Sequence, residues 1–142
     1  MITVNEIMSA NVITLKASDS VSSAKELMKN EDIRHLPVVD DNNFPVGIVT
    51  QRDIFKAQDS ELNGDNHIIN EEQVLLEQIM SRKISYALPD EPLRSAGLKL
   101  QKNKYGCLPV MDNDKLVGII TDFDFVGVAI NLIEQMEHSD FD

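Results

Sequence analysis

Two Thr-x-x-Asp motifs are the residues of this chain best suited to chemistry. Thr50 and Asp53 form the first and Thr121 and Asp124 the second, each after a Gly-Ile-hydrophobic run. Where a strand turns into a helix, such a pair predicts a capping box, in which hydroxyl and carboxylate accept free backbone N–H groups. The same turn suits a phosphate, and a carboxylate there can accept both hydroxyls of a ribose. The two interpretations are compatible, and both stay open.

The motifs belong to an internal repeat. Ile7-Met8-Ser9 recurs as Ile79-Met80-Ser81, and Leu36-Pro37-Val38 recurs as Leu108-Pro109-Val110, both shifted by 72 residues. Together with these two runs, the copies share fourteen identities in the same order with one gap, which makes chance a poor explanation.

Each copy predicts the same elements in the order β-α-β-β-α, and therefore an α+β fold. Three short strands and two helices cannot cover both faces of a sheet, so we expect the two units to pack sheet to sheet. The expected strands are 12–15, 36–39 and 46–49 in the first copy and 84–87, 108–111 and 117–120 in the second, with helices opening at Ser20, Pro92, and after Thr50 and Thr121. The predicted organisation is repeat 1 over 1–57, a polar linker and connecting helix over 58–78, and repeat 2 with a C-terminal helix over 79–142.

The composition narrows the range of partners. The chain carries 13 Lys and Arg against 24 Asp and Glu, a formal net charge of −11. Such a surface disfavours duplex nucleic acid and anionic membranes, although a local basic pocket can still hold a small anion. A single cysteine and an N-terminus without basic or long apolar stretches predict a cytoplasmic protein.

The chain resembles a tandem pair of CBS domains, the arrangement called a Bateman module. The resemblance rests on residues 33–40 and 47–54 in the first copy and on 105–112 and 118–125 in the second. It implies a pseudo-twofold pair of units with two clefts between them that bind adenosine ligands such as AMP, ADP or ATP. It also implies a regulatory protein without catalytic activity, a homodimer, and a separate regulated protein.

The candidate site residues follow from the motifs and the resemblance. Cations near the phosphates would come from Arg34, His35 and Arg52, and Arg34 is expected to serve the nucleotide whose ribose Asp53 holds. The second unit has uncharged residues at the matching positions, so the Asp53 cleft is the expected site of a charged nucleotide. The ribose would be held by Thr50, Asp53, Thr121 and Asp124, and the base would lie against Val12, Ile13, Thr14, Pro37, Ile84, Ser85, Tyr86 and Pro109. Plain strand packing is the alternative for the apolar residues, and a solvated strand edge for Arg34 and His35.

Catalytic and metal chemistry are not predicted. Cys107 is the one thiol, and a buried structural cysteine is far commoner than a nucleophile paired with His35. The histidines His35, His67 and His138 show no zinc spacing, and a magnesium ion would come only with nucleotide phosphates. The amphipathic segment 126–136 is suited to a dimer contact of the predicted module. The alternative hypothesis is a ligand-free dimerisation scaffold.

Overall fold

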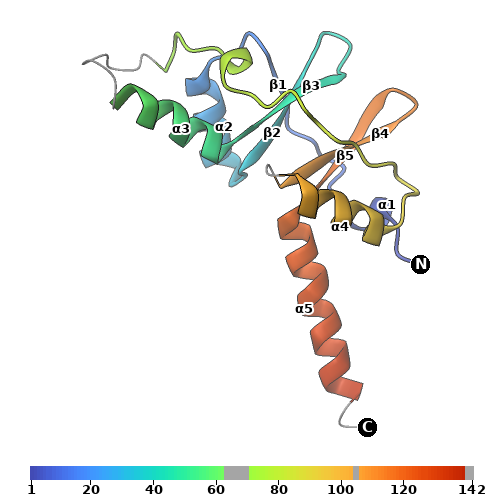
Figure 1. Cartoon of the computed structure of the whole chain (residues 1–142). Coiled ribbons are helices and arrows are strands. Elements are labelled where there is room, and N and C mark those ends of the chain that lie inside the picture. The colour runs from blue at the N-terminus through green and yellow to red at the C-terminus, as the bar shows by residue number, and fades with distance from the viewer. Residues whose placement is uncertain (63–70, 104–105, 140–142) are drawn as a thin grey trace.

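The computed structural model describes residues 1–62, 71–103 and 106–139 of the chain, folded as two similar units with two small sheets (Figure 1). The first unit contains β1 (Leu15–Lys16), α2 (Val21–Glu31), β2 (His35–Val39), β3 (Pro45–Thr50) and α3 (Gln51–Leu62). The second contains α4 (Leu93–Lys102), β4 (Cys107–Asp112), β5 (Lys115–Thr121) and α5 (Asp122–Ser139). Two short pieces, α1 (Val4–Ile7) and the 3₁₀ turn η1 (Leu76–Gln78), precede them. The predicted α+β fold of two repeats is confirmed.

The two units share one register of strand pairing. Strands β2 and β3 pair antiparallel with Val38 opposite Gly47, and β4 and β5 pair with Val110 opposite Gly118. In each ladder the register shifts directly after that pair, so even the irregularity is repeated. The two hairpins therefore have the same pairing and the same irregularity, as expected for two copies of one repeat.

The first strand of each unit is shorter than predicted. Only Leu15–Lys16 pairs with β2, in parallel, where a strand over 12–15 was expected. In the second unit the expected strand 84–87 is reduced to a single parallel bridge between Ala87 and Val110. The rest of each segment runs outside the ladder, and in the first unit it becomes the wall of a cleft at Ile13.

The segment 71–78 does not form the connecting helix expected within 58–78. Its only helical part is η1, because the first unit takes up its backbone hydrogen bonds: Leu76 N–H donates to Asp19 O at 2.9 Å and Glu77 N–H to Ala17 O at 3.1 Å. Gly64-Asp65-Asn66, the centre of the predicted linker, lies outside the described residues.

Helix starts follow the predicted capping chemistry. Ser20 caps α2, with its Oγ accepting from Ser23 N–H at 3.1 Å, and Pro92 occupies the cap position of α4. Within the described parts of the chain, no helix is long and apolar enough to cross a bilayer.

The segment that leads into each repeat, with Val4 and Met8 in the first and Leu76 and Met80 in the second, packs into the core of the other unit. Val4 is fully buried in the second hydrophobic cluster, where Met8 lies at its edge. Leu76 and Met80 occupy the same positions in the first cluster. The core of each unit is therefore completed by residues that lead into the other repeat, so we expect the two units to fold together.

Candidate functional site

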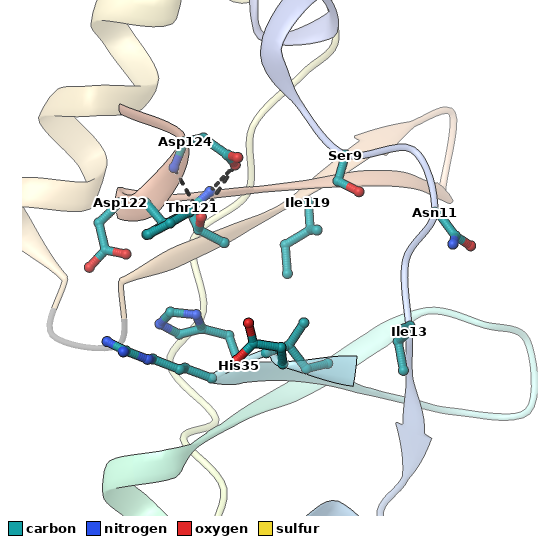
Figure 2. Close-up of a pocket in the computed structure, with 12 residues that line it drawn as sticks. Ser9, Asn11, Ile13, His35, Ile119, Thr121, Asp122 and Asp124 are labelled. Carbon is teal, nitrogen blue, oxygen red and sulfur yellow. Dashed lines mark hydrogen bonds between the residues drawn. The ribbon is translucent and has the colours of Figure 1, made fainter. Parts of the chain in front are cut away.

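A cleft of about 320 Å³ lies between the two units (Figure 2). Its walls come from three places: the segment after α1, the turn from α2 into β2, and the end of β5 with the first turn of α5. The lining residues are Ser9, Asn11, Ile13, Asp32, Ile33, Arg34, His35, Ile119, Thr121, Asp122, Phe123 and Asp124. This size is at the lower end of the range for small-molecule pockets.

Both Thr-x-x-Asp motifs form the predicted capping box. Thr121 N–H donates to Asp124 Oδ2 at 2.8 Å, and Asp124 N–H donates back to Thr121 Oγ1 at 3.3 Å. The first motif makes the same pair of bonds, at 2.9 Å and 3.1 Å, between Thr50 and Asp53. Within the described residues, these contacts use only Oδ2 of each carboxylate, so Oδ1 of Asp124 can accept hydrogen bonds from a molecule in the cleft.

Arg34 and His35 lie in the cleft of Asp124, not in a cleft with Asp53. The expectation that Arg34 serves the Asp53 ligand is therefore corrected. The reason is the twofold arrangement, which brings the start of β2 against the first turn of α5. A Cβ on Gly106 would lie 3.0 Å from His35 Nε2 and 2.8 Å from Asp122 Oδ2, so the three residues meet at one corner.

Burial lowers the pKa of His35 below its ordinary value of 6.5. The carboxylate of Asp122 opposes this shift, and the guanidinium of Arg34 adds to it. The imidazole is therefore a neutral hydrogen-bonding group at neutral pH, and the positive charge of the cleft comes from Arg34.

This shift predicts a pH dependence of folding stability. As pH falls through 6.5, the unfolded chain protonates His35 while the folded chain does not, so stability drops until the lowered folded pKa is passed. Urea unfolding of the wild type and of His35→Asn across this range measures the effect, because the variant lacks this part of the decline. A decline of equal size in both proteins would contradict the prediction.

Acidic groups outnumber cations in the cleft. Asp32, Asp122 and Asp124 all line it, against the single guanidinium of Arg34. Within the described residues, none of these carboxylates has a salt-bridge partner that would neutralise it. The cleft therefore carries a net negative charge when empty.

The other predicted site residues lie outside this cleft or at its border. Arg52 is exposed at the start of α3, and Thr50 is buried at the end of β3. The ring of Tyr86 packs at a tilt against Phe44, with centroids 6.1 Å apart. Val12 and Thr14 flank Ile13, Pro37 and Pro109 are buried within β2 and β4, Ile84 is half-buried and Ser85 is exposed.

The repeat predicts a counterpart cleft around Asp53, and two of the equivalent positions lie outside the described residues. Lys104 and Tyr105 correspond to Asp32 and Ile33 at the 72-residue shift, and both lie outside the described residues. The roles assigned to Thr50, Asp53, Ile84, Ser85 and Tyr86 stay predictions.

Sequence reasoning missed several lining residues. Ser9 belongs to the repeated Ile-Met-Ser motif and Ile119 to the repeated Gly-Ile pair, so both carried a signal that was used only to define the repeat. Asp122 and Phe123 lie inside the second Thr-x-x-Asp motif. Asn11 and Asp32 belong to no recognised motif, and they line the cleft only because the two units pack together.

Nucleophilic and metal chemistry find no support among the described residues. Cys107 is fully buried, and this burial raises the pKa of its thiol far above the usual range, so the thiolate needed for attack is not formed. Across 1–62, 71–103 and 106–139, no group of three or more His, Cys, Asp or Glu side chains could hold a metal ion.

The chain is a tandem-repeat module: the segment leading into each repeat packs on the other unit, and the two units share one cleft. The sequence model of the CBS domain matches residues 4–60 and 76–131, so the chain belongs to the CBS domain family.

Solved structures of CBS pairs have the same fold. AcuB from Vibrio cholerae, named for acetoin utilization, is 42% identical, with a TM-score of 0.83 over 96% of this chain and 98% of that one. The CBS domain pair of protein MJ0100, in complex with 5′-methylthioadenosine and S-adenosyl-L-methionine, is 30% identical, with a TM-score of 0.80 over 92% and 98% of the chains. CBSX2 in complex with AMP is 30% identical, with a TM-score of 0.76 over 93% and 98%; CBSX2 is a CBS-pair protein from Arabidopsis thaliana.

Curated relatives are larger proteins. A homoserine O-acetyltransferase of Methanococcoides burtonii is 35% identical over 122 residues, which is 85% of this chain but 23% of that enzyme. The similarity therefore covers a minor part of the enzyme.

Proposed function

We propose that this chain is a regulatory module that binds an adenosine-type ligand in the cleft of Asp124. The observation that carries the proposal is that one cleft joins residues from both units with a carboxylate at the strand-to-helix turn. A ligand that touches both units stabilises one relative orientation of them, and this change is the signal passed to a regulated protein. We propose no catalytic role, and the predicted cytoplasmic location suits such a module.

The lining residues suit the parts of an adenosine. Asp124 Oδ1 would accept the ribose hydroxyls, and Ile13 with Ile119 would form the apolar walls for the base (Figure 2). Arg34 and His35 would face the substituent on the 5′ carbon, on the other side of the ribose. The bound adenosines of the related CBS pairs support this class of ligand.

The charge of the cleft predicts which adenosines bind best. Three carboxylates against one guanidinium favour a ligand with few negative charges. We expect 5′-methylthioadenosine and AMP to bind at least about tenfold more tightly than ATP. A magnesium ion stays a prediction that applies only to a phosphorylated ligand.

Thermal unfolding with each compound tests both the proposal and the preference. A ligand at about 100 times its Kd should add about 2.7 kcal/mol to the free energy of unfolding. Inosine 5′-monophosphate is the matched control for AMP, because it changes only the base. If no adenosine compound shifts the transition, the ligand-binding proposal fails; if ATP binds most tightly, the charge argument fails.

A ligand-free dimerisation scaffold is the second candidate function. The observation that favours it is the large apolar surface of α5, whose Phe123 and Met136 are 78% and 67% exposed. Mass spectrometry of the natively purified protein separates the two candidates, since a sensor carries a bound adenosine and a scaffold does not.

A further inference from the structure

One end of the cleft brings His35 and Asp122 face to face. Figure 2 shows the imidazole of His35 on one wall and the carboxylate of Asp122 on the opposite wall. His35 Nε2 and Asp122 Oδ2 both lie within 3.0 Å of one point beside Gly106, so the two atoms are no more than about 6 Å apart. At this separation a carboxylate favours the protonated form of a histidine. This end of the cleft is therefore suited to hold a proton.

His35 is nevertheless neutral at neutral pH in the protein alone. Burial of the imidazole lowers its pKa more than the carboxylate of Asp122 raises it, and the guanidinium of Arg34 acts in the same direction as burial. Within the described residues, neither ring nitrogen has a hydrogen-bond partner, so the imidazole can bind a ligand without losing a contact. A further negative charge at this end of the cleft would shift the balance toward the imidazolium.

The charged groups that share the cleft with His35 come from two elements, the turn before β2 and the first turn of α5. They are Asp32, Arg34, Asp122 and Asp124. The neighbouring strands add no charge among the described residues: Thr50 of β3 lies opposite His35, and Cys107 of β4 is a buried, uncharged thiol. His35 is therefore the one group at this end that we expect to gain a charge when an anion enters.

We propose that His35 determines how the cleft recognises the substituent on the 5′ carbon of an adenosine, by taking up a proton when that substituent is anionic. This inference rests on the proposed binding of an adenosine in the cleft. The phosphate of AMP would bring up to two negative charges to the end where Asp122 already lies, and together they favour the imidazolium. The thioether of 5′-methylthioadenosine brings no charge, so His35 stays neutral beside it.

This linkage has a definite sign. Because AMP favours the imidazolium, the pKa of His35 is higher in the complex than in the free protein, and the complex holds more protons. The affinity for AMP therefore rises as pH falls through the higher pKa, and it becomes constant once the free protein is protonated as well. The affinity for 5′-methylthioadenosine does not change over the same range.

Isothermal titration at about pH 8 and about pH 5.5 tests the inference, because a histidine changes its charge within this range. The phosphate of AMP itself titrates near pH 6, so the wild type is compared with His35→Gln, which keeps a hydrogen-bonding group but cannot take up a proton. From the higher to the lower pH, the rise in AMP affinity should be about tenfold larger in the wild type than in His35→Gln. His138→Gln is the matched control: it removes an exposed histidine of α5 outside the cleft, and it should behave as the wild type does.

A direct measurement of proton uptake does not depend on the variants. The wild type is titrated with adenosine 5′-sulfate, whose charge is constant over this range, in two buffers of different ionisation enthalpy. We expect uptake of a proton with this ligand and none with 5′-methylthioadenosine. No uptake with the sulfate, or an equal pH dependence of AMP binding in the wild type and His35→Gln, overturns the inference and leaves the proposed function standing. If no adenosine compound binds at any pH, the proposed function fails and the inference fails with it.

Discussion

Asp124→Ala is expected to weaken the binding of 5′-methylthioadenosine or AMP by about 100-fold, because two charge-assisted hydrogen bonds to the ribose are lost. The carboxylate lies in the cleft shared by both units, and its Oδ1 makes no bond with the described residues of the chain. Isothermal titration measures the affinity and the number of ligands bound.

Asp53→Ala is the matched control for this substitution. It removes the same capping box, with N···O distances of 2.9 Å and 3.1 Å, from the start of α3. Both variants should lose about 1 kcal/mol of stability from the lost cap, yet only Asp124→Ala should lose the ligand. If both variants bind like the wild type, no carboxylate holds the ribose. If only Asp53→Ala loses affinity, the ligand lies in the other cleft.

The boundaries between strands and helices were predictable because local chemistry decides them. Ser20 and the two Thr-x-x-Asp motifs supply the capping groups that the structure uses. The repeat then supplied the equivalent helix starts a second time, 72 residues further on at Pro92 and 71 residues further on at the second motif. The exceptions are the first strand of each unit, which is shorter than predicted, and 71–78, where bonds to Asp19 and Ala17 in the first unit override a helical pattern.

The partners within the cleft were not predictable in the same way. A repeat shows which positions are equivalent, but it does not show which unit's elements face each other. Arg34 was assigned to the carboxylate of its own unit, whereas the structure places it beside the acid of the second unit, Asp124. Asp32 and Asp122 reverse the expected charge of the site, and only the packing of the two units shows that both face the same cleft.

The packing of each leading segment on the opposite unit could not be predicted, for a similar reason. The repeated Ile-Met-Ser motif marks Met8 and Met80 as equivalent, without showing that each packs on the opposite unit. The evidence is a pair of glycines: a Cβ on Gly118 would lie 2.5 Å from Met8 Sδ, and one on Gly47 would lie 2.5 Å from Met80 Sδ. Both positions need glycine because a backbone oxygen, of Ser9 or of Ser81, would lie only 3.0 Å from an added Cβ.

Gly118→Val is therefore expected to destabilise the protein by about 2–3 kcal/mol. The methionine side chain could move, but the added Cβ would also lie 3.0 Å from the backbone oxygen of Ser9. Ser9 and Ile119 exchange backbone hydrogen bonds of 3.0 Å and 2.9 Å, so the segment cannot shift without breaking them. Urea unfolding measures the loss, and a change below about 0.5 kcal/mol would contradict the close packing.

The equivalent variant Gly47→Val separates stability from binding. It meets Met80 and the backbone oxygen of Ser81 at the same distances of 2.5 Å and 3.0 Å, so it should cost a similar free energy. Ser9 lines the cleft of Asp124 and Ser81 does not, so Gly118→Val should weaken the ligand more than Gly47→Val does. Equal weakening by both variants would mean that the leading segment acts only on stability. A selective loss in Gly118→Val would show that the segment before the first repeat positions the site between the units.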